Sequence, residues 1–270
     1  MTAGSSLDRD TALVTGVLGN LGPVWADALL GAGARVVGVD LFDVKTSEEF
    51  AALLDRYGDT RLRLLRADVT DRASLGEVFR WCESQDWLPS VLVNNAGIDH
   101  PPTTPHGTQR IEEIPRGPFT EVFDVNVYGT FLTMQLFGPA MVKAGRGSII
   151  NIGSLYAAVA PDQRLYDHLA ADPPFLKAPA YGASKAAVVN LTRYFATLWA
   201  PFGVRVNALS PGGVRGRQDD EFQRKYASRV PMGRMATPAD LGGPLIFLAS
   251  SASSYVTGID LRVDGGFTAW

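Results

Sequence analysis

The stretch TALVTGVLGNLG, residues 11–22, places a short apolar run directly before a glycine-rich turn. The run 11–16 predicts a buried strand that ends at a glycine, and the pattern over 21–32 predicts a helix after the turn. Glycines at 16, 19 and 22 permit a tight turn and close approach of the backbone to a pyrophosphate. Many strand–helix turns need glycine for geometry alone, so its position at the first such junction is what predicts a dinucleotide site.

The rest of the chain alternates strands and helices in the same way. We predict further strands at 35–40, 61–69, 90–97, 147–154, 204–212 and 258–266, and helices at 47–56, 73–82, 124–143, 181–199 and 238–248. Strands separated by helices pair in parallel through right-handed crossovers. The fold class is therefore α/β, a doubly wound Rossmann-type sheet of about seven parallel strands with helices on both faces. No linker divides residues 1–270, so we expect a single domain.

Two proline-rich segments, 98–118 and 160–179, interrupt this alternation, and both follow the end of a predicted strand. In open α/β sheets the ligand crevice lies at the carboxyl ends of the strands. Long loops at that edge are more often functional than decorative. We therefore predict that both segments are insertions beside a substrate site.

The composition is that of a globular protein, with 46% hydrophobic residues and a net charge of −3. This charge gives no electrostatic signature for nucleic acid or an anionic membrane. Cys82 is the single cysteine, which excludes an internal disulfide and fits a reducing compartment. The chain starts without a signal-peptide pattern and contains no apolar run of 18 residues, so we expect a cytoplasmic protein. The three histidines have no metal-site spacing, so we expect no metal.

Asp40 closes the second predicted strand, 18 positions after Gly22. A carboxylate there can accept hydrogen bonds from both hydroxyls of an adenosine ribose, and it would repel a 2′-phosphate. The next residues, Leu41 and Phe42, offer no arginine to hold such a phosphate. The alternative is a surface aspartate at a strand end. The pattern favours NAD over NADP as cofactor.

Further motifs follow in order along the chain. They are ADV (67–69), NNAG (94–97), VNVYGT (125–130), NIGS (151–154), YGASK (181–185), NALSPG (207–212) and VDGG (263–266). Each is weak alone, but with TGVLGNLG and Asp40 the ordered set is highly specific. Together they resemble the short-chain dehydrogenase/reductase family over essentially the whole chain.

The resemblance implies roles position by position. The family's catalytic tetrad falls on Asn126, Ser154, Tyr181 and Lys185. Residues 94, 96 and 97 would flank the adenine ribose and support the central strand, and residues 68 and 69 would bracket the adenine. The full set of implied cofactor residues is Gly16, Gly19, Asn20, Leu21, Gly22, Asp40, Leu41, Asp68, Val69, Asn94, Asn95, Ala96, Gly97, Tyr181, Lys185, Pro211, Gly212 and Val214.

Tyr181 and Lys185 are one helical turn apart and project from the same face. The alternative interpretation is that Tyr181 is a core residue and Lys185 a solvated neighbour. The resemblance instead implies that Tyr181 exchanges the hydroxyl proton of an alcohol while hydride passes to the cofactor. Free tyrosine has a pKa of about 10, and a nearby ammonium favours tyrosinate. Ser154 would orient the substrate oxygen, and Asn126 would hold water in a proton relay.

Two departures from the family pattern are visible. Asn20 stands where the family usually has its second glycine, and we expect it to use the left-handed backbone that asparagine tolerates. Ser154 and Tyr181 are 27 positions apart, about twice the usual separation. The extra segment carries Asp162, Arg164, His168, Asp172 and Lys177.

These polar groups predict a polyhydroxylated or anionic substrate, such as a sugar, sugar acid or cyclitol, although a solvated surface loop is the alternative. The LYAAVAPDQRLY pattern is similar to relatives assigned to sugar and nonulosonate metabolism. Candidate substrate residues are His100, Tyr156, Arg164, His168 and Gln218, with His106 in the first long loop as a further candidate.

Other functions stay open at this point. A ketoreductase of carrier-bound acyl chains or steroids would have an apolar site and an NADP-adapted second strand. A non-catalytic dinucleotide sensor would lack Tyr181 or Lys185. The resemblance also implies pairing of the C-terminal segment 254–270 across two-fold axes, so we expect a homotetramer, with a dimer next.

Overall fold

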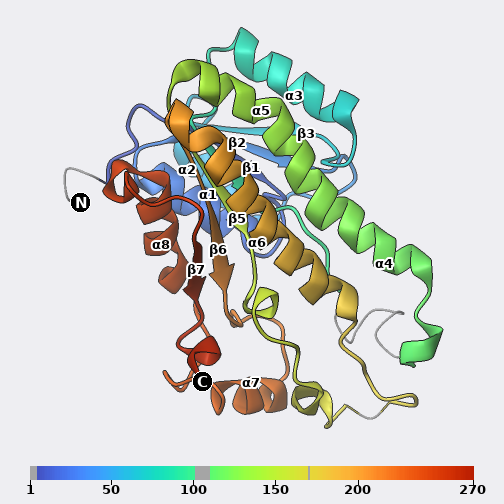
Figure 1. Ribbon diagram of the computed structural model, residues 1–270. Helices are drawn as coiled ribbons and strands as arrows, with labels where there is room; N and C mark the ends of the chain where they lie inside the picture. Colours follow the sequence, from blue (N-terminus) through green and yellow to red (C-terminus); the bar gives the residue numbers. More distant parts are fainter. Residues whose placement is uncertain (1–4, 101–109, 170) are drawn as a thin grey trace.

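The computed structural model describes residues 5–100, 110–169 and 171–270, and a seven-stranded parallel sheet lies at its centre (Figure 1). The strand order is β3-β2-β1-β4-β5-β6-β7, as expected for the doubly wound class. The strands are β1 (Thr11–Thr15), β2 (Arg35–Asp40), β3 (Leu62–Arg66), β4 (Val91–Asn94), β5 (Gly147–Ile152), β6 (Val204–Pro211) and β7 (Asp260–Val263).

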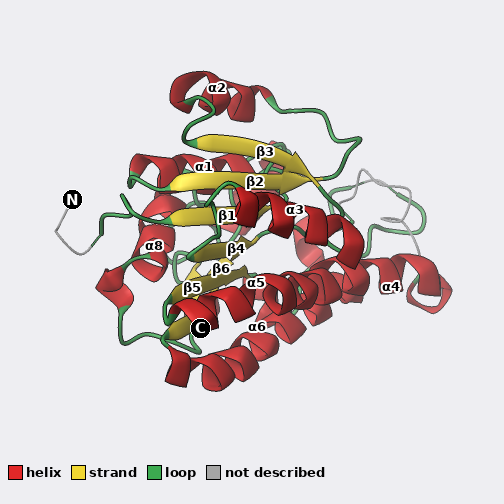
Figure 2. Ribbon diagram, turned by 90° about the horizontal axis from the view of Figure 1, so that it is seen from above, coloured by secondary structure: helices red, strands yellow, loops and turns green. Residues whose placement is uncertain are grey.

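Helices cover both faces of this sheet (Figure 2). Helices α1 (Gly22–Gly31), α2 (Glu48–Tyr57) and α8 (Ala239–Ala249) pack on one face. Helices α3 (Arg72–Ser84), α5 (Thr130–Ala144) and α6 (Pro179–Trp199) pack on the other. Two shorter helices, α4 (Arg116–Phe123) and α7 (Asp220–Ala227), lie near the carboxyl ends of the strands.

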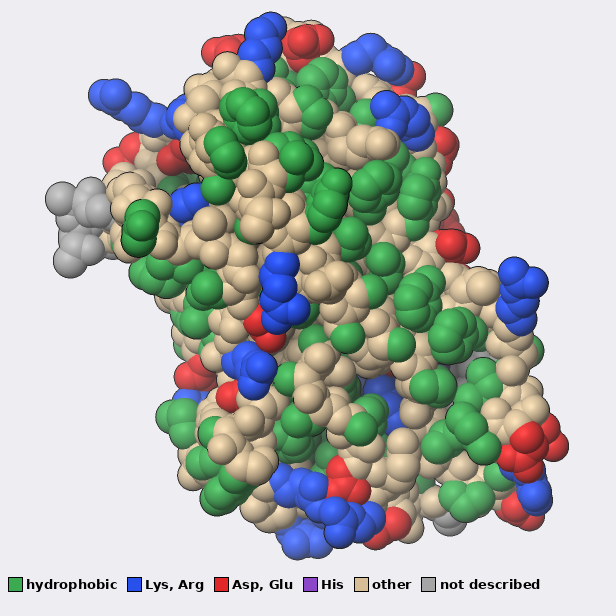
Figure 3. All heavy atoms as spheres, in the orientation of Figure 1, with side chains coloured by type: hydrophobic (Ala, Val, Ile, Leu, Met, Phe, Trp, Pro, Cys, Tyr) green, Lys and Arg blue, Asp and Glu red, His purple; other side chains and the backbone are tan. Residues whose placement is uncertain are grey.

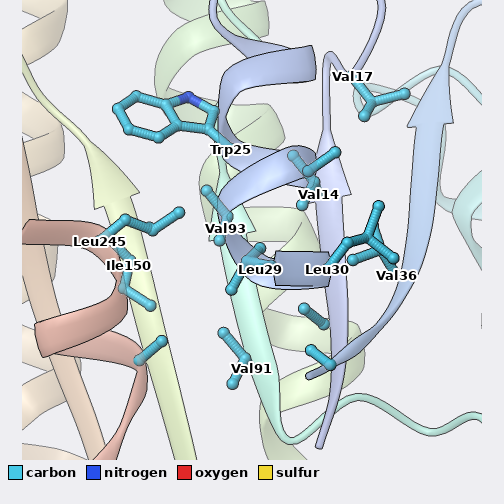
Figure 4. Close-up of a cluster of buried hydrophobic side chains, with 14 of the residues drawn as sticks. Val14, Val17, Trp25, Leu29, Leu30, Val36, Val91, Val93, Ile150 and Leu245 are labelled. Carbon is cyan, nitrogen blue, oxygen red and sulfur yellow. The ribbon is translucent and has the colours of Figure 1, made fainter. Parts of the chain in front are cut away.

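The alternation of side chains along each strand explains why both faces are apolar. In β1, Ala12 and Val14 join the core under α1 and α8, while Leu13 joins the core under α3 and α5. On the first face, Trp25, Leu29 and Leu30 of α1 lie against strand residues that include Val14, Val93 and Ile150, with Leu245 of α8 beside them (Figure 4). Strands buried on both faces read as nearly continuous apolar runs, which is the pattern seen in the sequence.

Several elements differ from the sequence prediction, among them the strands predicted at 90–97 and 258–266, which are shorter and span Val91–Asn94 and Asp260–Val263. The helix predicted at 124–143 begins eight residues earlier, at Arg116, and passes through a π-helical stretch, Asp124–Gly129. The strand predicted over 61–69 ends at Arg66, because its ladder partner β2 ends at Asp40. Helix α7 was not predicted. It is short, and the Asp219 side chain caps it by accepting from the Phe222 amide.

The second insertion, 160–179, is not a fully solvated loop, because several of its apolar side chains are buried. Leu165, Tyr166 and Phe175 pack with Tyr226 of α7 and Leu155 in a third apolar cluster. The first insertion, 98–118, lies partly outside the described residues, and His106 is among those not described. Within the described part of the chain, none of the helices combines the length and hydropathy that a membrane span requires.

The strand order reverses between β1 and β4, which are neighbours in the sheet. At such a switch point the two following turns diverge to opposite faces and leave a crevice. The turn after β1 carries the glycine-rich stretch, and the turn after β4 carries NNAG. The topology therefore brings these two motifs together at one edge.

Candidate active site

A cavity of about 770 Å³ lies at the carboxyl ends of the strands. Most of the sequence-predicted site residues line it, namely Gly16, Gly19, Asn20, Leu21, Asp40, Leu41, Asp68, Val69, Asn95, Ala96, Gly97, Ser154, Tyr181, Lys185, Pro211, Gly212 and Val214. Gly22, Asn94 and Asn126 are absent from this wall, and each has a structural partner instead. One cavity thus joins the glycine-rich turn to the Tyr181–Lys185 face of α6.

The glycine-rich turn is held close to the turn after β4. Gly16 has φ +63°, and a Cβ placed on it would lie 2.7 Å from Ala96 Cα. A Cβ on Gly22 would lie 2.3 Å from the Val17 carbonyl oxygen, so the start of α1 packs directly on the turn. Helix α1 starts with no side-chain cap from any described residue and no acidic residue in its first turn. Its amide donors and positive dipole end suit a phosphate group.

The expectation of a left-handed Asn20 is wrong. Among the described residues, Asp86 is the one non-glycine with positive φ. The turn closes instead through Gly16, with the Gly19 amide donating to the Gly16 carbonyl and the Gly22 amide donating to the Gly19 carbonyl. Because Gly16 adopts the left-handed backbone conformation, Asn20 does not need to adopt it.

Asp40 at the end of β2 is fixed by backbone donors. Its Oδ2 accepts from the Leu18 amide at 2.7 Å, and its Oδ1 accepts from the Leu41 amide at 2.9 Å. Arg66, at the end of the neighbouring strand β3, donates to the carbonyls of Leu41 and Val44. The carboxylate is therefore oriented before any ligand arrives, and this arginine is occupied by backbone.

The two asparagines of NNAG have different hydrogen-bond partners. Asn95 Oδ1 accepts from Trp25 Nε1 at 2.8 Å, while its Nδ2 donates to the carbonyls of Thr15 and Gly16. Asn94 is buried in the sheet and donates to Asn151 Oδ1 at 2.7 Å. Asn95 thus ties α1 and the first turn to the second, and Asn94 supports the central strands away from the cavity.

Asp68 fixes the turn after β3. Its Oδ1 accepts from both the amide and the hydroxyl of Thr70, and its own amide donates to Ser74 Oγ. Val69 packs beneath this turn at van der Waals distance from Gly129, where a Cβ would lie 2.7 Å from Val69 Cγ2. The pair forms one side wall of the cavity.

Ser154, Tyr181 and Lys185 meet at the inner end of the cavity. The Ser154 hydroxyl donates a hydrogen bond to the Tyr181 phenol oxygen. Lys185 Nζ donates to the Ile152 carbonyl at 2.7 Å and lies 5.7 Å from the Tyr181 ring centroid. The three groups of the predicted tetrad that line the cavity are therefore adjacent.

Burial decides the protonation of these groups. It raises the pKa of Tyr181, and Asp99 raises it further, while the hydrogen bond from Ser154 opposes the change. Burial also lowers the pKa of Lys185 to about 8, opposed by the attraction of Asp99. We expected Lys185 and the cationic nicotinamide of NAD⁺ together to favour tyrosinate. In the protein alone, burial and Asp99 raise the pKa of Tyr181, so the chain's own residues keep it protonated at neutral pH.

Asn126 lies in the π-helical stretch and clamps the backbone after NNAG. Its Oδ1 accepts from the Ile98 amide at 2.8 Å, and its Nδ2 donates to the Ile98 carbonyl and to Ser184 Oγ, each at 3.0 Å. Ser184 in turn donates to the Tyr181 carbonyl. The side chain therefore links the turn after β4 to the first turn of α6.

The five candidate substrate residues do not lie on the wall of this cavity. Arg164 is paired with Asp162, and His168 contacts Asp219 and Lys225. Gln218 bonds to the backbone of Gly216 and Val214, and Tyr156 bonds to Tyr166. His100 lines a separate, small cavity with Ile114 and Leu176.

Two residues near the cavity were not assigned as site residues from sequence. Asp99, two residues after NNAG, lines the wall, and Lys177 of the insertion forms an ion pair with it. Lys177 Nζ lies 5.3 Å from the Tyr181 ring centroid. A charged residue directly after the strand-end motif was the available signal for Asp99, whereas its partner lies 78 positions away in sequence.

Comparisons with known proteins agree on the family. The model of the family described as Enoyl-(Acyl carrier protein) reductase matches residues 16–268. A 2-dehydro-3-deoxy-D-gluconate 5-dehydrogenase of Bacillus subtilis (strain 168) is 34% identical, covering 97% of this chain and 96% of the relative. A galactitol 2-dehydrogenase (L-tagatose-forming) of Cereibacter sphaeroides is 36% identical, covering 98% and 97%.

Solved structures agree as well. A short chain dehydrogenase of Leptospira borgpetersenii serovar Hardjo-bovis with bound NAD⁺ has TM-score 0.83 and 33% identity, covering 97% of this chain and 94% of that one. A putative NAD(P)-dependent gluconate 5-dehydrogenase of Beutenbergia cavernae with bound NADP has TM-score 0.83 and 35% identity, covering 99% and 100%.

The chain belongs to the short-chain dehydrogenase/reductase family. It is an oxidoreductase that acts on CH–OH groups, and its relatives support a secondary-alcohol dehydrogenase of the sugar and polyol type.

We predict that Asn126→Ala lowers the free energy of unfolding by about 1–3 kcal/mol, because the half-buried amide and carbonyl of Ile98 lose their partners. Asn190→Ala, at an exposed position of α6, is the matched control and should change stability by less than about 0.5 kcal/mol. Urea unfolding of both variants measures the difference. Equal stability would show that Asn126 does not hold the turn.

Proposed function

We propose that this protein is an NAD-dependent dehydrogenase of a secondary alcohol or lactol in a sugar, sugar acid or cyclitol, with Tyr181 as acid and base. The observation that carries the proposal is the adjacency of Ser154, Tyr181 and Lys185 at the inner end of a cavity whose outer end holds Asp40. We propose further that residues 1–270 form a single catalytic domain, and that the enzyme is cytoplasmic.

The cavity suits a nicotinamide dinucleotide at both ends. The close packing at Gly16 and the uncapped start of α1 leave room and amide donors for a pyrophosphate. Gly97, Pro211, Gly212 and Val214 also line the cavity, and the last three would lie along the nicotinamide. When bound, such a cofactor supplies the hydride acceptor or donor and, in its oxidised form, a positive ring.

The residues of the chain then divide the proton chemistry. Ser154 hydrogen-bonds the substrate oxygen and orients it toward the Tyr181 phenol. In oxidation Tyr181 takes the hydroxyl proton, and in reduction it donates that proton. Lys185 holds ribose hydroxyls and stabilises the tyrosinate. Asn126 positions the turn after β4 and supports a proton path through ordered water.

Asp40 supports NAD as the cofactor. Its two carboxylate oxygens are already oriented by the Leu18 and Leu41 amides, so each has further acceptor capacity for a ribose hydroxyl. A 2′-phosphate at the same place would meet this negative charge. Arg66, which stands beside it, is engaged by two backbone carbonyls.

The alternatives are weaker. A ketoreductase of carrier-bound acyl chains or steroids fits the description of the family model, but the carboxylates on the cavity wall favour a hydroxylated substrate. A non-catalytic dinucleotide sensor would not require Ser154, Tyr181 and Lys185 to be adjacent.

Exposed apolar side chains support a homo-oligomer. Tyr194, Leu198 and Phe202 are exposed on and just after α6, and Tyr255 and Trp270 are exposed in the C-terminal segment. Hydrophobic side chains lie along the face formed by α5 and α6 (Figure 3). Strand β7 lies at the sheet edge, where unpaired backbone groups invite a partner.

Tyr181→Phe should lower kcat/KM for alcohol oxidation by about 10²–10⁴-fold, because it removes the acid and base. NADH binding, followed by fluorescence, should stay unchanged. Tyr255→Phe alters a fully exposed phenol and should retain full activity. A fully active Tyr181→Phe enzyme would contradict the assignment.

The same proton transfer predicts a pH dependence. Because burial raises the pKa of Tyr181, kcat/KM for oxidation should rise as the pH rises from 6 toward 8. Lys185, with a pKa of about 8, is mostly an ammonium over the lower part of this range and about half protonated at its upper end. Reduction needs the protonated phenol and should stay nearly constant over that window. Initial rates in both directions measure this, and an oxidation rate that falls with pH would overturn it.

Asp40→Asn should raise the ratio of NADP⁺ to NAD⁺ kcat/KM by about tenfold or more, because it removes the charge that opposes a 2′-phosphate. Asp55→Asn, an exposed carboxylate on α2, is the control of equal charge change and should leave the ratio unaltered. A wild-type enzyme that prefers NADP⁺ would reject the role of Asp40.

Light scattering after size exclusion should give the mass of a tetramer, with a dimer as the next expected species. Tyr194→Arg should shift the population toward a smaller assembly by placing a charge on the exposed apolar face. A monomeric wild-type protein at micromolar concentration would reject both assemblies.

A further inference from the structure

The ion pair between Asp99 and Lys177 is a strongly polar feature near Tyr181 that the proton chemistry does not use. We propose that Asp99 is the specificity-determining acceptor for substrate hydroxyl groups, anchored by Lys177, and that the enzyme therefore selects a neutral polyol or sugar over a sugar acid. This inference rests on the proposed function and narrows its substrate class.

Asp99 is presented to the cavity as a fixed acceptor. It follows the turn after β4, lines the wall with Ser154 and Tyr181, and keeps 35% of its side chain exposed. Its Oδ1 accepts from the His100 amide at 2.8 Å, and its Oδ2 pairs with Lys177 Nζ. Each carboxylate oxygen can accept a second hydrogen bond, so the exposed side can receive hydroxyl donors from a ligand.

Lys177 is the anchor rather than a wall residue. Its side chain is 6% exposed, and its own amide donates to Gln163 Oε1 at 2.9 Å, which ties it to the insertion. A buried ammonium requires a counter-charge, so the pair holds Asp99 in one orientation. Asp99 lines the cavity wall and Lys177 does not, so a ligand in the cavity meets the carboxylate more readily than the buried ammonium.

The charged residues on the cavity wall also favour a neutral substrate over a sugar acid. Among the described residues that line the cavity, Lys185 is the single cation, and the carboxylates are Asp40, Asp68, Asp99, Glu121 and Asp124. Lys177 also lies near Tyr181, with its Nζ 5.3 Å from the ring centroid, but its charge is paired with Asp99. A substrate carboxylate would therefore face Asp99, whereas a hydroxyl-rich neutral substrate finds acceptors.

Paired substrates test this directly. Galactitol and D-threitol are compared with galactonate and D-threonate, which replace one terminal CH₂OH by a carboxylate. We expect the wild-type kcat/KM with NAD⁺ to favour the neutral member of each pair by about tenfold or more. Asp99→Asn should bring that ratio close to one, mainly by lowering the neutral rate. A wild-type preference for the acids, or an unchanged ratio in Asp99→Asn, would overturn the proposal.

The design separates folding and function from specificity. Asp99→Asn leaves Lys177 buried without its partner, so the double variant Asp99→Asn/Lys177→Met is measured beside it and should show the same loss of ratio. Asp167→Asn breaks a comparable pair with Lys225 on the outer surface and should leave the ratio unchanged.

Calorimetric titration of the four compounds into the NADH-loaded protein gives the same ratio as Kd values, without turnover. If no alcohol is oxidised but binding remains selective and sensitive to Asp99, the proposed function fails and this inference stands. Equal Kd values within each pair would overturn the inference while leaving the catalytic assignment intact.

Discussion

The structure depends on the contact between the turn after β1 and the turn after β4. Gly16 approaches Ala96 so closely that a Cβ would lie 2.7 Å from its Cα, and the Asn95 amide bonds across the gap to the carbonyls of Thr15 and Gly16. Trp25 bonds to the same Asn95 and fixes the start of α1. One asparagine thus sets where α1 begins relative to the backbone that leads to Ile98 and Asp99.

That backbone carries the constraint on to the catalytic helix. Asn126 holds Ile98 from the π-helical stretch and bonds to Ser184, one turn from Tyr181. A π-helical stretch widens a helix locally, and such stretches are frequent at functional sites. The outcome is that Tyr181 and Lys185 lie in an environment dry enough to raise the pKa of the phenol and lower that of the ammonium. Both shifts oppose charge, so in the proposed mechanism the tyrosinate depends on a positively charged cofactor beside it.

The sequence was sufficient for the features that are local or periodic. Apolar strands between amphipathic helices predicted the sheet, and the four-residue spacing of Tyr181 and Lys185 predicted their shared face. Features that depend on tertiary partners were not predictable. The 124–143 pattern looks continuous, so the π-helical stretch was invisible, and Asp219 becomes the partner of His168 only when α7 packs on the insertion. Arg164 illustrates the same point, since Asp162 occupies it and it does not reach the cavity wall.

An acidic cavity wall is compatible with an anionic cofactor, because different groups of the protein contact the pyrophosphate and the hydroxyl groups. Backbone amides and the dipole of α1 can hold a pyrophosphate without lysine or arginine, so the chain has no need of cations along the cofactor path. The side-chain carboxylates are then available as acceptors for hydroxyl groups, Asp40 at the ribose end and Asp99 at the substrate end. Lys177 differs from Lys185 because its ammonium forms an ion pair with Asp99 and is not part of the cavity wall. In our proposal, the insertion that carries Lys177 therefore influences substrate binding by holding the Asp99 carboxylate in place. The exposed charges of the insertion need not touch the ligand.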